Sequence, residues 1–170
     1  MKKKVLFVFG TRPEAIKMAP IINFFKENNK KFITLVIVTA QHREMLDQVL
    51  NIFNIKPDYD LDLMSSDQTL ESLTGKILNG ISDLLIDQKP DLIFVQGDTT
   101  TTFASALAAF YNKIPVAHIE AGLRTNNIYS PFPEEINRRM TSAISTYHFP
   151  PTKNAMQNLL NEGIDKKKIK

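Results

Sequence analysis

The sequence predicts an α/β fold in which one parallel β-sheet carries helices on both of its faces. Short apolar runs alternate along the chain with longer segments whose apolar residues recur at helical spacing, and this alternation is typical of βαβ units. The apolar runs are nearly continuous, as expected for parallel strands that helices cover on both sides. With 170 residues and ordinary proportions of hydrophobic and charged residues, the chain has the size and composition of one globular domain.

Each predicted strand is followed by a helical pattern. The first strand, residues 5–9, ends at Gly10, and Pro13 suits the first turn of the next helix, where its missing N–H costs nothing. Pro20 lies inside the same helical pattern and predicts a kink or a break. The further strands are expected at residues 35–38, 92–96, 116–119 and 147–149, with a short exposed strand or an extended loop at 58–63.

The helices between the strands are predicted from their apolar faces and caps. A single apolar stripe within residues 70–85 indicates a helix packed on the core, with Ser66, Asp67 or Thr69 as its cap. The other helical patterns lie after Gly10 and in residues 45–53, 100–111, 134–144 and 152–163.

Two segments have no such pattern. Residues 123–133 hold two asparagines and two prolines and are expected to form a mobile loop. Residues 164–170 are expected to lead into one more strand.

The charge of the chain does not indicate a nucleic-acid partner. The net charge is +3, but seven of the 21 basic residues lie within the first four and the last five positions. The rest of the chain has 14 basic and 18 acidic residues. The body of the domain is therefore acidic, and no basic face with interleaved aromatic residues is evident.

Composition also narrows the kinds of site. The chain has no cysteine, which excludes disulfides and thiol chemistry, and its three histidines are too scattered to suggest a metal site. We expect neither a metal nor a cofactor. The apolar run after Lys2 to Lys4 is too short for a signal peptide, and no run reaches membrane-spanning length. We therefore expect a cytoplasmic protein without a membrane partner.

Three carboxylates are placed to share one pocket. Asp98 and Glu120 each follow a predicted strand, and Glu134 stands where the next helix begins. Ligands of parallel sheets bind outside the carboxyl ends of the strands, so these side chains are candidates for acid–base chemistry. Each one alone has a plainer explanation: Asp98 could cap a helix, and Glu134 could complement a helix dipole or form a surface ion pair with Arg138, four residues on.

A second candidate site is the turn after the first strand. A glycine turn that leads into a helix N-terminus attracts anions, and Gly10 is followed by the basic residues Arg12 and Lys17. The G-x-G-x-x-G spacing of dinucleotide sites is absent. Phosphate binding and ordinary solvated charges are equally compatible with Arg12 and Lys17. His42 also follows a strand, and a local hydrogen-bonding role is the simpler interpretation for it.

Five motifs in order carry a resemblance to one family. They are residues 10–20 (GTRPEAIKMAP), 39–46 (TAQHREML), 97–102 (GDTTTT), 118–125 (HIEAGLRT) and 133–138 (PEEINR). Together they resemble the bacterial non-hydrolysing UDP-N-acetylglucosamine (UDP-GlcNAc) 2-epimerases, and the resemblance runs from Lys4 to the end of the chain.

The resemblance implies a fold and a domain organisation. Family members resemble GT-B glycosyltransferases, in which two Rossmann-like domains enclose the active site. Residues 1–170 correspond to the N-terminal domain, and the second domain, which would supply most uridine contacts and a further catalytic histidine, is expected to be absent. The chain alone is therefore expected to be half an enzyme. A homodimer of the full-length protein and a role in cell-envelope polysaccharide synthesis follow from the same resemblance.

The resemblance also implies a reaction and roles for residues. The family interconverts UDP-GlcNAc and UDP-N-acetylmannosamine (UDP-ManNAc) by eliminating UDP to give 2-acetamidoglucal and adding it back. By resemblance Asp98, Glu120 and Glu134 are the acid–base residues, without a specific face of the sugar assigned to any of them. Two further sets are implied: Gly10, Arg12, Lys17 and Arg138 for the substrate, and Gln41, His42 and Arg43 for a second, activating UDP-GlcNAc. A hydrolysing relative that releases ManNAc and a non-catalytic nucleotide-sugar module remain the alternatives.

Overall fold

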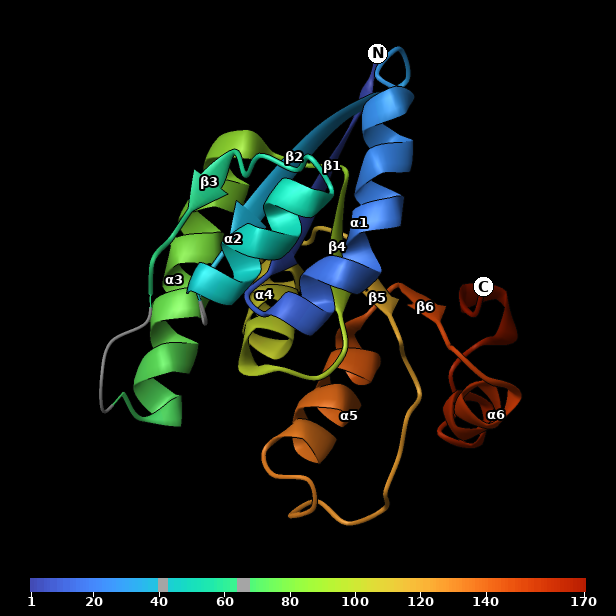
Figure 1. The fold of residues 1–170 in the computed structure, drawn as a ribbon. Coiled ribbons are helices and arrows are strands. Elements are labelled where there is room, and N and C mark those ends of the chain that lie inside the picture. The colour runs from blue at the N-terminus through green and yellow to red at the C-terminus, as the bar shows by residue number, and fades with distance from the viewer. Residues whose placement is uncertain (40–42, 64–67) are drawn as a thin grey trace.

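The computed structural model describes residues 1–39, 43–63 and 68–170. This part of the chain forms a six-stranded sheet in the order β3-β2-β1-β4-β5-β6, and every neighbouring pair is parallel (Figure 1). The strands are β1 (Lys3–Phe9), β2 (Phe32–Val38), β3 (Tyr59–Asp60), β4 (Leu92–Gln96), β5 (Val116–Ile119) and β6 (Tyr147–Phe149). This is the doubly wound order 3-2-1-4-5-6 of Rossmann-like folds. The predicted fold class is confirmed.

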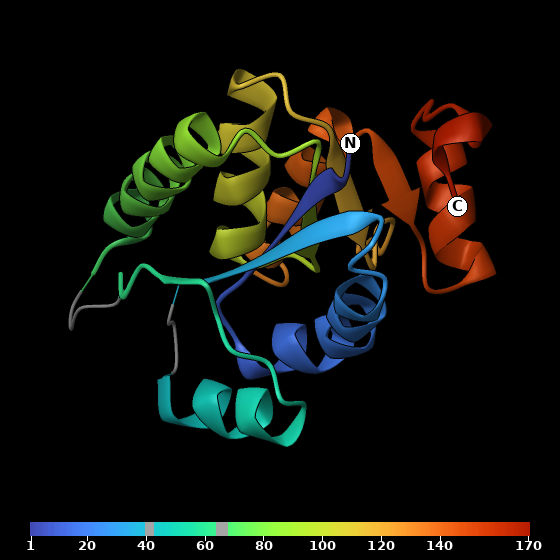
Figure 2. The same ribbon diagram turned by 90° about the horizontal axis from the view of Figure 1, so that it is seen from above.

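Helices cover both faces of the sheet. They are α1 (Arg12–Glu27), α2 (Arg43–Ile52), α3 (Leu70–Gln88), α4 (Thr100–Tyr111), α5 (Glu134–Ile144) and α6 (Lys153–Asn161), followed by a short 3₁₀ turn at Lys166–Lys168. Figure 2 shows α1 and α2 on one side of the sheet and α3 and α4 on the other.

The central strand β1 explains the two layers. Its alternate residues Val5, Phe7 and Phe9 pack with α1 and α2, whereas Leu6 and Val8 pack with α3 and α4. All five are at most 2% exposed. Burying a side chain of this kind stabilises the fold by about 1.5–3 kcal/mol, so this strand anchors two cores at once.

Helix α1 continues through Pro20, so of the two expectations for this residue, a kink or a break, the break is wrong. Pro20 is exposed, and the buried face of α1 runs on both sides of it through Ala15, Met18, Ala19 and Ile22. The packing of this face on the sheet outweighs the single backbone hydrogen bond that proline cannot donate.

Several predicted element ends are confirmed. The side chain of Thr69 accepts from Ser72 N–H at 3.3 Å and caps α3, whereas the other two candidate caps lie outside the described residues. Thr152 caps α6, and Gly163 follows the C-terminal end of that helix with a φ of 84°. Near the C-terminus, Ile169 forms one parallel bridge to His148 of β6. The expected further strand is therefore present as a single bridge.

Loop 123–133, which was expected to be mobile, is tied to α5 at Thr125 and Asn126. Both backbone N–H groups donate to the buried carboxylate of Glu135, at 3.0 and 3.2 Å. Across the described ranges, no helix is long and apolar enough to cross a bilayer.

Gly122 permits a close contact between the end of β5 and α6. Its φ is 90°, and a Cβ built on it would lie 2.2 Å from the carbonyl oxygen of Ala155. We expect Gly122→Ala to lower the free energy of unfolding by about 2–4 kcal/mol, because both the left-handed backbone and the clash oppose a side chain. Urea denaturation measures this loss.

Gly75→Ala is the matched control. Gly75 lies inside α3, and a Cβ there would meet no atom within 4 Å. We expect this change to be neutral or to stabilise by up to roughly 1 kcal/mol. Equal unfolding midpoints for the two variants would contradict a rigid contact at Gly122.

Candidate active site

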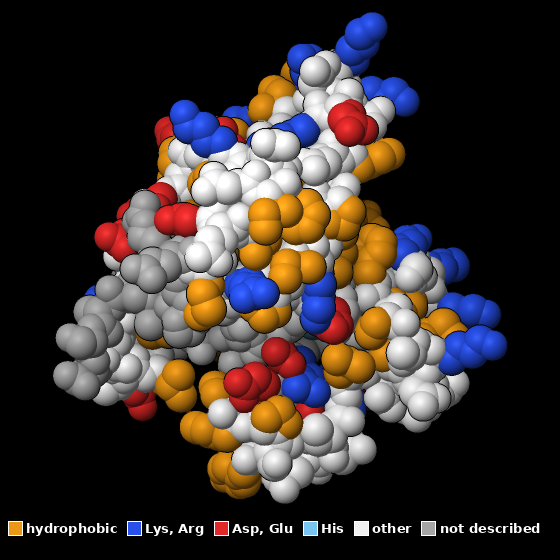
Figure 3. All heavy atoms as spheres, in the orientation of Figure 1, with side chains coloured by type: hydrophobic (Ala, Val, Ile, Leu, Met, Phe, Trp, Pro, Cys, Tyr) orange, Lys and Arg blue, Asp and Glu red, His pale blue; other side chains and the backbone are white. Residues whose placement is uncertain are grey.

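Three of the residues predicted from the sequence, Asp98, Glu120 and Lys17, meet at the carboxyl ends of β4 and β5, whereas Glu134 and Arg138 are not part of the cleft lining. A cleft of about 360 Å³ opens there against the start of α1. Its lining consists of Thr11, Pro13, Glu14, Lys17, Gln96, Gly97, Asp98, Thr99 and Glu120. Figure 3 shows acidic and basic side chains side by side on the face where α1 approaches α5.

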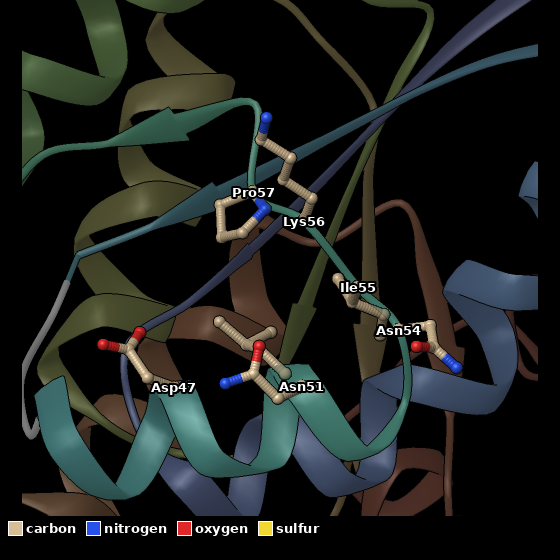
Figure 4. Close-up of a pocket in the computed structure, with 7 residues that line it drawn as sticks. Asp47, Asn51, Asn54, Ile55, Lys56 and Pro57 are labelled. Atoms are coloured by element: carbon tan, nitrogen blue, oxygen red, sulfur yellow. The ribbon is translucent and has the colours of Figure 1, made fainter.

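A larger hollow of about 550 Å³ lies elsewhere, between the end of α2 and β3 (Figure 4). Its lining is Asp47, Leu50, Asn51, Asn54, Ile55, Lys56 and Pro57. None of the predicted catalytic residues lines it. Volume alone therefore does not mark the site, whereas the convergence of strand ends does.

Glu120 is held by two donors in a strained backbone conformation. Lys17 Nζ lies 2.6 Å from its Oε2, and Gln96 Nε2 donates to the same oxygen. Its φ of 65° lies in the left-handed region, which costs a non-glycine residue about 1–2 kcal/mol. Strain of this kind is concentrated at functional sites.

Asp98 forms an ion pair with a buried arginine. Arg138 Nη2 lies 2.6 Å from Oδ2 of Asp98, and Asn137 donates to the Asp98 backbone oxygen at 3.0 Å. Burial raises the pKa of Asp98, the Arg138 charge opposes this, and the nearby charges of Glu134 and Glu120 raise it further. Asp98 therefore holds a proton more readily than an exposed aspartate does.

The structure excludes a helix-cap role for Asp98 and places Glu134 in the first turn of a helix. The cap of α4 is Thr99, which accepts from Thr102 N–H at 3.1 Å, so Asp98 does not have that role. Glu134 does lie in the first turn of α5. The alternative explanation, a surface ion pair with Arg138, is not found among the described residues, because Arg138 pairs with Asp98 and Glu135 instead.

Glu14 is a buried carboxylate that the motif reasoning did not single out. It is 2% exposed, and its Oε2 accepts from the N–H groups of Gly10 and Thr11 at 2.9 and 2.7 Å. Its Oε1 accepts from the hydroxyls of Thr99 and Thr102 at 2.7 and 3.1 Å. Burial raises the pKa of Glu14, and these hydrogen bonds oppose the rise. The spacing Thr11-x-x-Glu14 is a capping-box signal that could have predicted it.

The glycine turn after β1, which is the second candidate site, has two of its amides bonded to Glu14. The Gly10 amide, expected to be available for an anion, donates to Glu14. Lys17 lines the cleft, whereas Arg12 is exposed and lies outside the cleft lining. Of the basic residues proposed for the substrate, Lys17 and Arg138 thus contact the carboxylates directly.

His118 supports the turn that carries Asp98. It is fully buried, and its Nε2 lies 2.7 Å from the carbonyl oxygen of Gly97, so this nitrogen carries the proton and donates. Burial lowers the pKa of His118 to about 4, which keeps the ring neutral. Sequence spacing could not distinguish this role from that of a surface histidine.

The residues implied for a second, activating ligand lie largely outside the described part of the chain. This applies to Gln41 and His42, and Arg43 begins α2 with a side chain that is not described. Their proposed role stays a prediction.

A model of the UDP-N-acetylglucosamine 2-epimerase family matches residues 26–170, which is most of the chain. The chain belongs to the UDP-N-acetylglucosamine 2-epimerase family. The family expected from the five motifs is thereby confirmed.

Individual relatives agree with this membership. A Thermotoga maritima protein provisionally named as a UDP-N-acetylglucosamine 2-epimerase is 61% identical over 161 residues, which are 95% of this chain and 42% of that protein. The crystal structure of UDP-GlcNAc 2-epimerase from Neisseria meningitidis bound to UDP-GlcNAc has 59% identity and a TM-score of 0.93, over 98% of this chain and 45% of that one.

A more distant family member has the same fold. The crystal structure of the Methanocaldococcus jannaschii enzyme in complex with UDP-GlcNAc and UDP has 43% identity and a TM-score of 0.91, over 98% of this chain and 45% of that one. These likenesses confirm a Rossmann-like domain of the kind that forms the first half of GT-B proteins. The chain spans less than half the length of each of these relatives.

The Glu14 contacts give a stability prediction. Glu14→Ala leaves the Gly10 and Thr11 amides without their acceptor, so we expect the free energy of unfolding to fall by about 2–5 kcal/mol. Glu14→Gln keeps one acceptor for the amides and offers its NH₂ to the threonine hydroxyls, so we expect less than about 1.5 kcal/mol of loss. Urea unfolding of both variants tests this. An equal loss in both would show that the charge, and not the hydrogen bonds, holds the turn.

Proposed function

We propose that this chain supplies the acid–base groups of a UDP-GlcNAc 2-epimerase of the non-hydrolysing type, which interconverts UDP-GlcNAc and UDP-ManNAc. The observation that carries the proposal is the meeting of Asp98 and Glu120 in one cleft, with the Glu134 charge acting on Asp98 and Lys17 bonded to Glu120. Family membership and the UDP-GlcNAc bound to the Neisseria relative support the choice of substrate.

The chemistry explains why several carboxylates are useful. The C2 proton of the sugar is not next to a carbonyl group, so its direct removal would be very difficult. Elimination avoids this problem: a base takes the C2 proton, the electron pair of that C–H bond forms the C1–C2 double bond, and UDP leaves with the C1–O bonding pair. The product is 2-acetamidoglucal. Protonation of C2 on the opposite face and return of UDP to C1 complete the inversion, with no net oxidation or reduction.

Charged residues in the cleft and beside it match these needs. Burial raises the pKa of Asp98 above that of an exposed aspartate, which suits a group that both gives and takes a proton. Glu120 and Glu134 are the other acid–base candidates, and the assignment of each to one face of the sugar is left open. The departing diphosphate gains negative charge, and Lys17, Arg138 and Arg12 are the cations proposed to stabilise it.

We propose that the complete site requires residues beyond this chain. The matched region makes up 42% of the Thermotoga protein and 45% of the Neisseria chain. In a GT-B arrangement the second domain would close the cleft and hold the uridine. The activity is therefore proposed for the full-length protein, and the 170-residue chain is expected to be inactive alone. A cytoplasmic homodimer that feeds cell-envelope polysaccharide synthesis is the setting proposed for it.

Deuterium exchange tests the reaction. UDP-GlcNAc is incubated in D₂O with a chain extended through the second domain and, separately, with residues 1–170, and both samples are followed by proton NMR. We expect deuterium at C2 together with UDP-ManNAc from the extended chain and none from residues 1–170. Free ManNAc with UDP would indicate a hydrolysing enzyme. Substrate binding without exchange in the extended chain would indicate a non-catalytic module and refute the proposal.

Asp98→Asn tests the central carboxylate. In the extended chain we expect turnover to fall by roughly 10²- to 10⁴-fold, as for loss of a general acid or base. Burial already favours the neutral form of Asp98, so the neutral asparagine should leave the unfolding midpoint nearly unchanged.

Asp91→Asn is the matched control for this variant. Asp91 precedes β4 at its other end and pairs with Lys3 at 2.7 Å, away from the cleft. The Asp91→Asn variant should keep normal turnover. Near-normal turnover in Asp98→Asn as well would remove Asp98 from the chemistry.

A further inference from the structure

Glu135 is a buried, charged residue that the proposed reaction does not use. Its side chain is fully buried, and besides the two backbone N–H groups of loop 123–133 it contacts two arginines. Arg139 Nε lies 3.1 Å from Oε1, and Arg138 Nη1 lies 3.5 Å from Oε2. Burial alone would raise the pKa of Glu135, but these hydrogen bonds and charges hold it below its usual range. These contacts therefore favour the charged form of Glu135 inside the protein.

The Arg138 guanidinium lies between this charge and the candidate active site. Its Nη2 contacts Asp98 at 2.6 Å while its Nη1 faces Glu135 at 3.5 Å. Arg138 is only 9% exposed, so solvent screens neither contact strongly. One cation thus serves two carboxylates, of which only Asp98 lines the cleft.

Sharing a cation weakens its effect on each partner. An arginine at hydrogen-bond distance normally stabilises the charged form of an aspartate strongly and would make it a poor proton donor. Here the negative charge of Glu135 offsets part of the Arg138 charge. Burial and the charges of Glu134 and Glu120 also raise the pKa of Asp98 against the Arg138 charge, so an offset of that charge acts in the same direction.

We propose that Glu135 acts through Arg138 and offsets part of the charge that this arginine presents to Asp98, so that Asp98 remains able to exchange a proton. The functional meaning of this inference rests on the proposed epimerase reaction, whereas the electrostatic coupling does not. Glu135 also ties loop 123–133 to the helix that carries Arg138, so that loop and cation are held together.

Other charges near Asp98 and Glu135 must stay the same when the proposal is tested. Asp98 is influenced by Glu134 of α5, by Glu120 after β5 and by Arg138. Lys17 of α1 approaches from the Glu120 side of the cleft. On the other side of Glu135, Glu162 follows α6 and interacts with Arg124, Arg139 and Glu135. A substitution at Glu135 leaves all of these side chains in place.

The test is a ¹³C NMR titration of the Asp98 side-chain carboxyl, which requires no activity. Glu135→Gln keeps the size of the side chain and one acceptor oxygen but removes the charge. We expect the Asp98 titration midpoint to fall by about one pH unit, because the full Arg138 charge then acts on it. An unchanged or raised midpoint would overturn the proposal.

Glu162→Gln is the matched control. Glu162 makes the same kind of contact as Glu135, with Arg124 at 2.7 Å, but it does not contact Arg138. Its removal should leave the Asp98 midpoint unchanged. A fall equal to that in Glu135→Gln would show a general charge effect and overturn the specific role of Glu135.

Arg139→Gln keeps the proposal testable if Glu135→Gln does not fold. Arg139 is 35% exposed, and its loss leaves Arg138 as the arginine that neutralises Glu135. We expect the Asp98 midpoint to rise, and a fall or no change would overturn the proposal. In the extended chain, the pH profile of C2 exchange should move with the NMR midpoint. A shifted midpoint without any exchange would refute the epimerase reaction and leave the coupling standing.

Discussion

The parallel sheet centred on β1 is the constraint on which the rest of the structure depends. β1 is paired on both edges by parallel strands and packed on both faces, so neighbouring strands must share its direction. Every carboxyl end in the sheet then lies at one edge. The turns after β1, β4 and β5 are brought together there, although Gly10, Asp98 and Glu120 are far apart in the sequence.

Two buried carboxylates, Glu14 and Glu135, hold this edge together, and Asp98 and Glu120 are more exposed. Glu14 links the turn after β1 to the turn after β4 through two amides and two hydroxyls. Glu135 links α5 to the loop after β5. Each buried charge has several donors, as it must when water is excluded. Asp98 and Glu120 have fewer protein partners and remain partly open to a ligand.

Two parts of the structure show where local sequence signals were insufficient. Pro20 allows a kink or a break of α1 when the helix is considered alone, and the buried face of that helix, which continues on the sheet, excludes the break. A surface pair of Glu134 with Arg138 is the alternative that helical spacing offers, but Asp98 competes for the same arginine from another segment. In both cases a tertiary contact outweighs a local preference.

The sequence by itself determined the fold class, the strands, the ends of several helices and the family, because these depend on local periodicity, turn residues and contiguous motifs. It also predicted that Asp98, Glu120 and Lys17 lie at one edge of the sheet, since residues that follow parallel strands share that edge. Only the tertiary structure decided which charges are paired: Lys17 with Glu120, Arg138 with Asp98 and Glu135, and Glu14 with the amides of Gly10 and Thr11. Pairing depends on distance and burial in three dimensions, and neither quantity can be read from spacing along the chain.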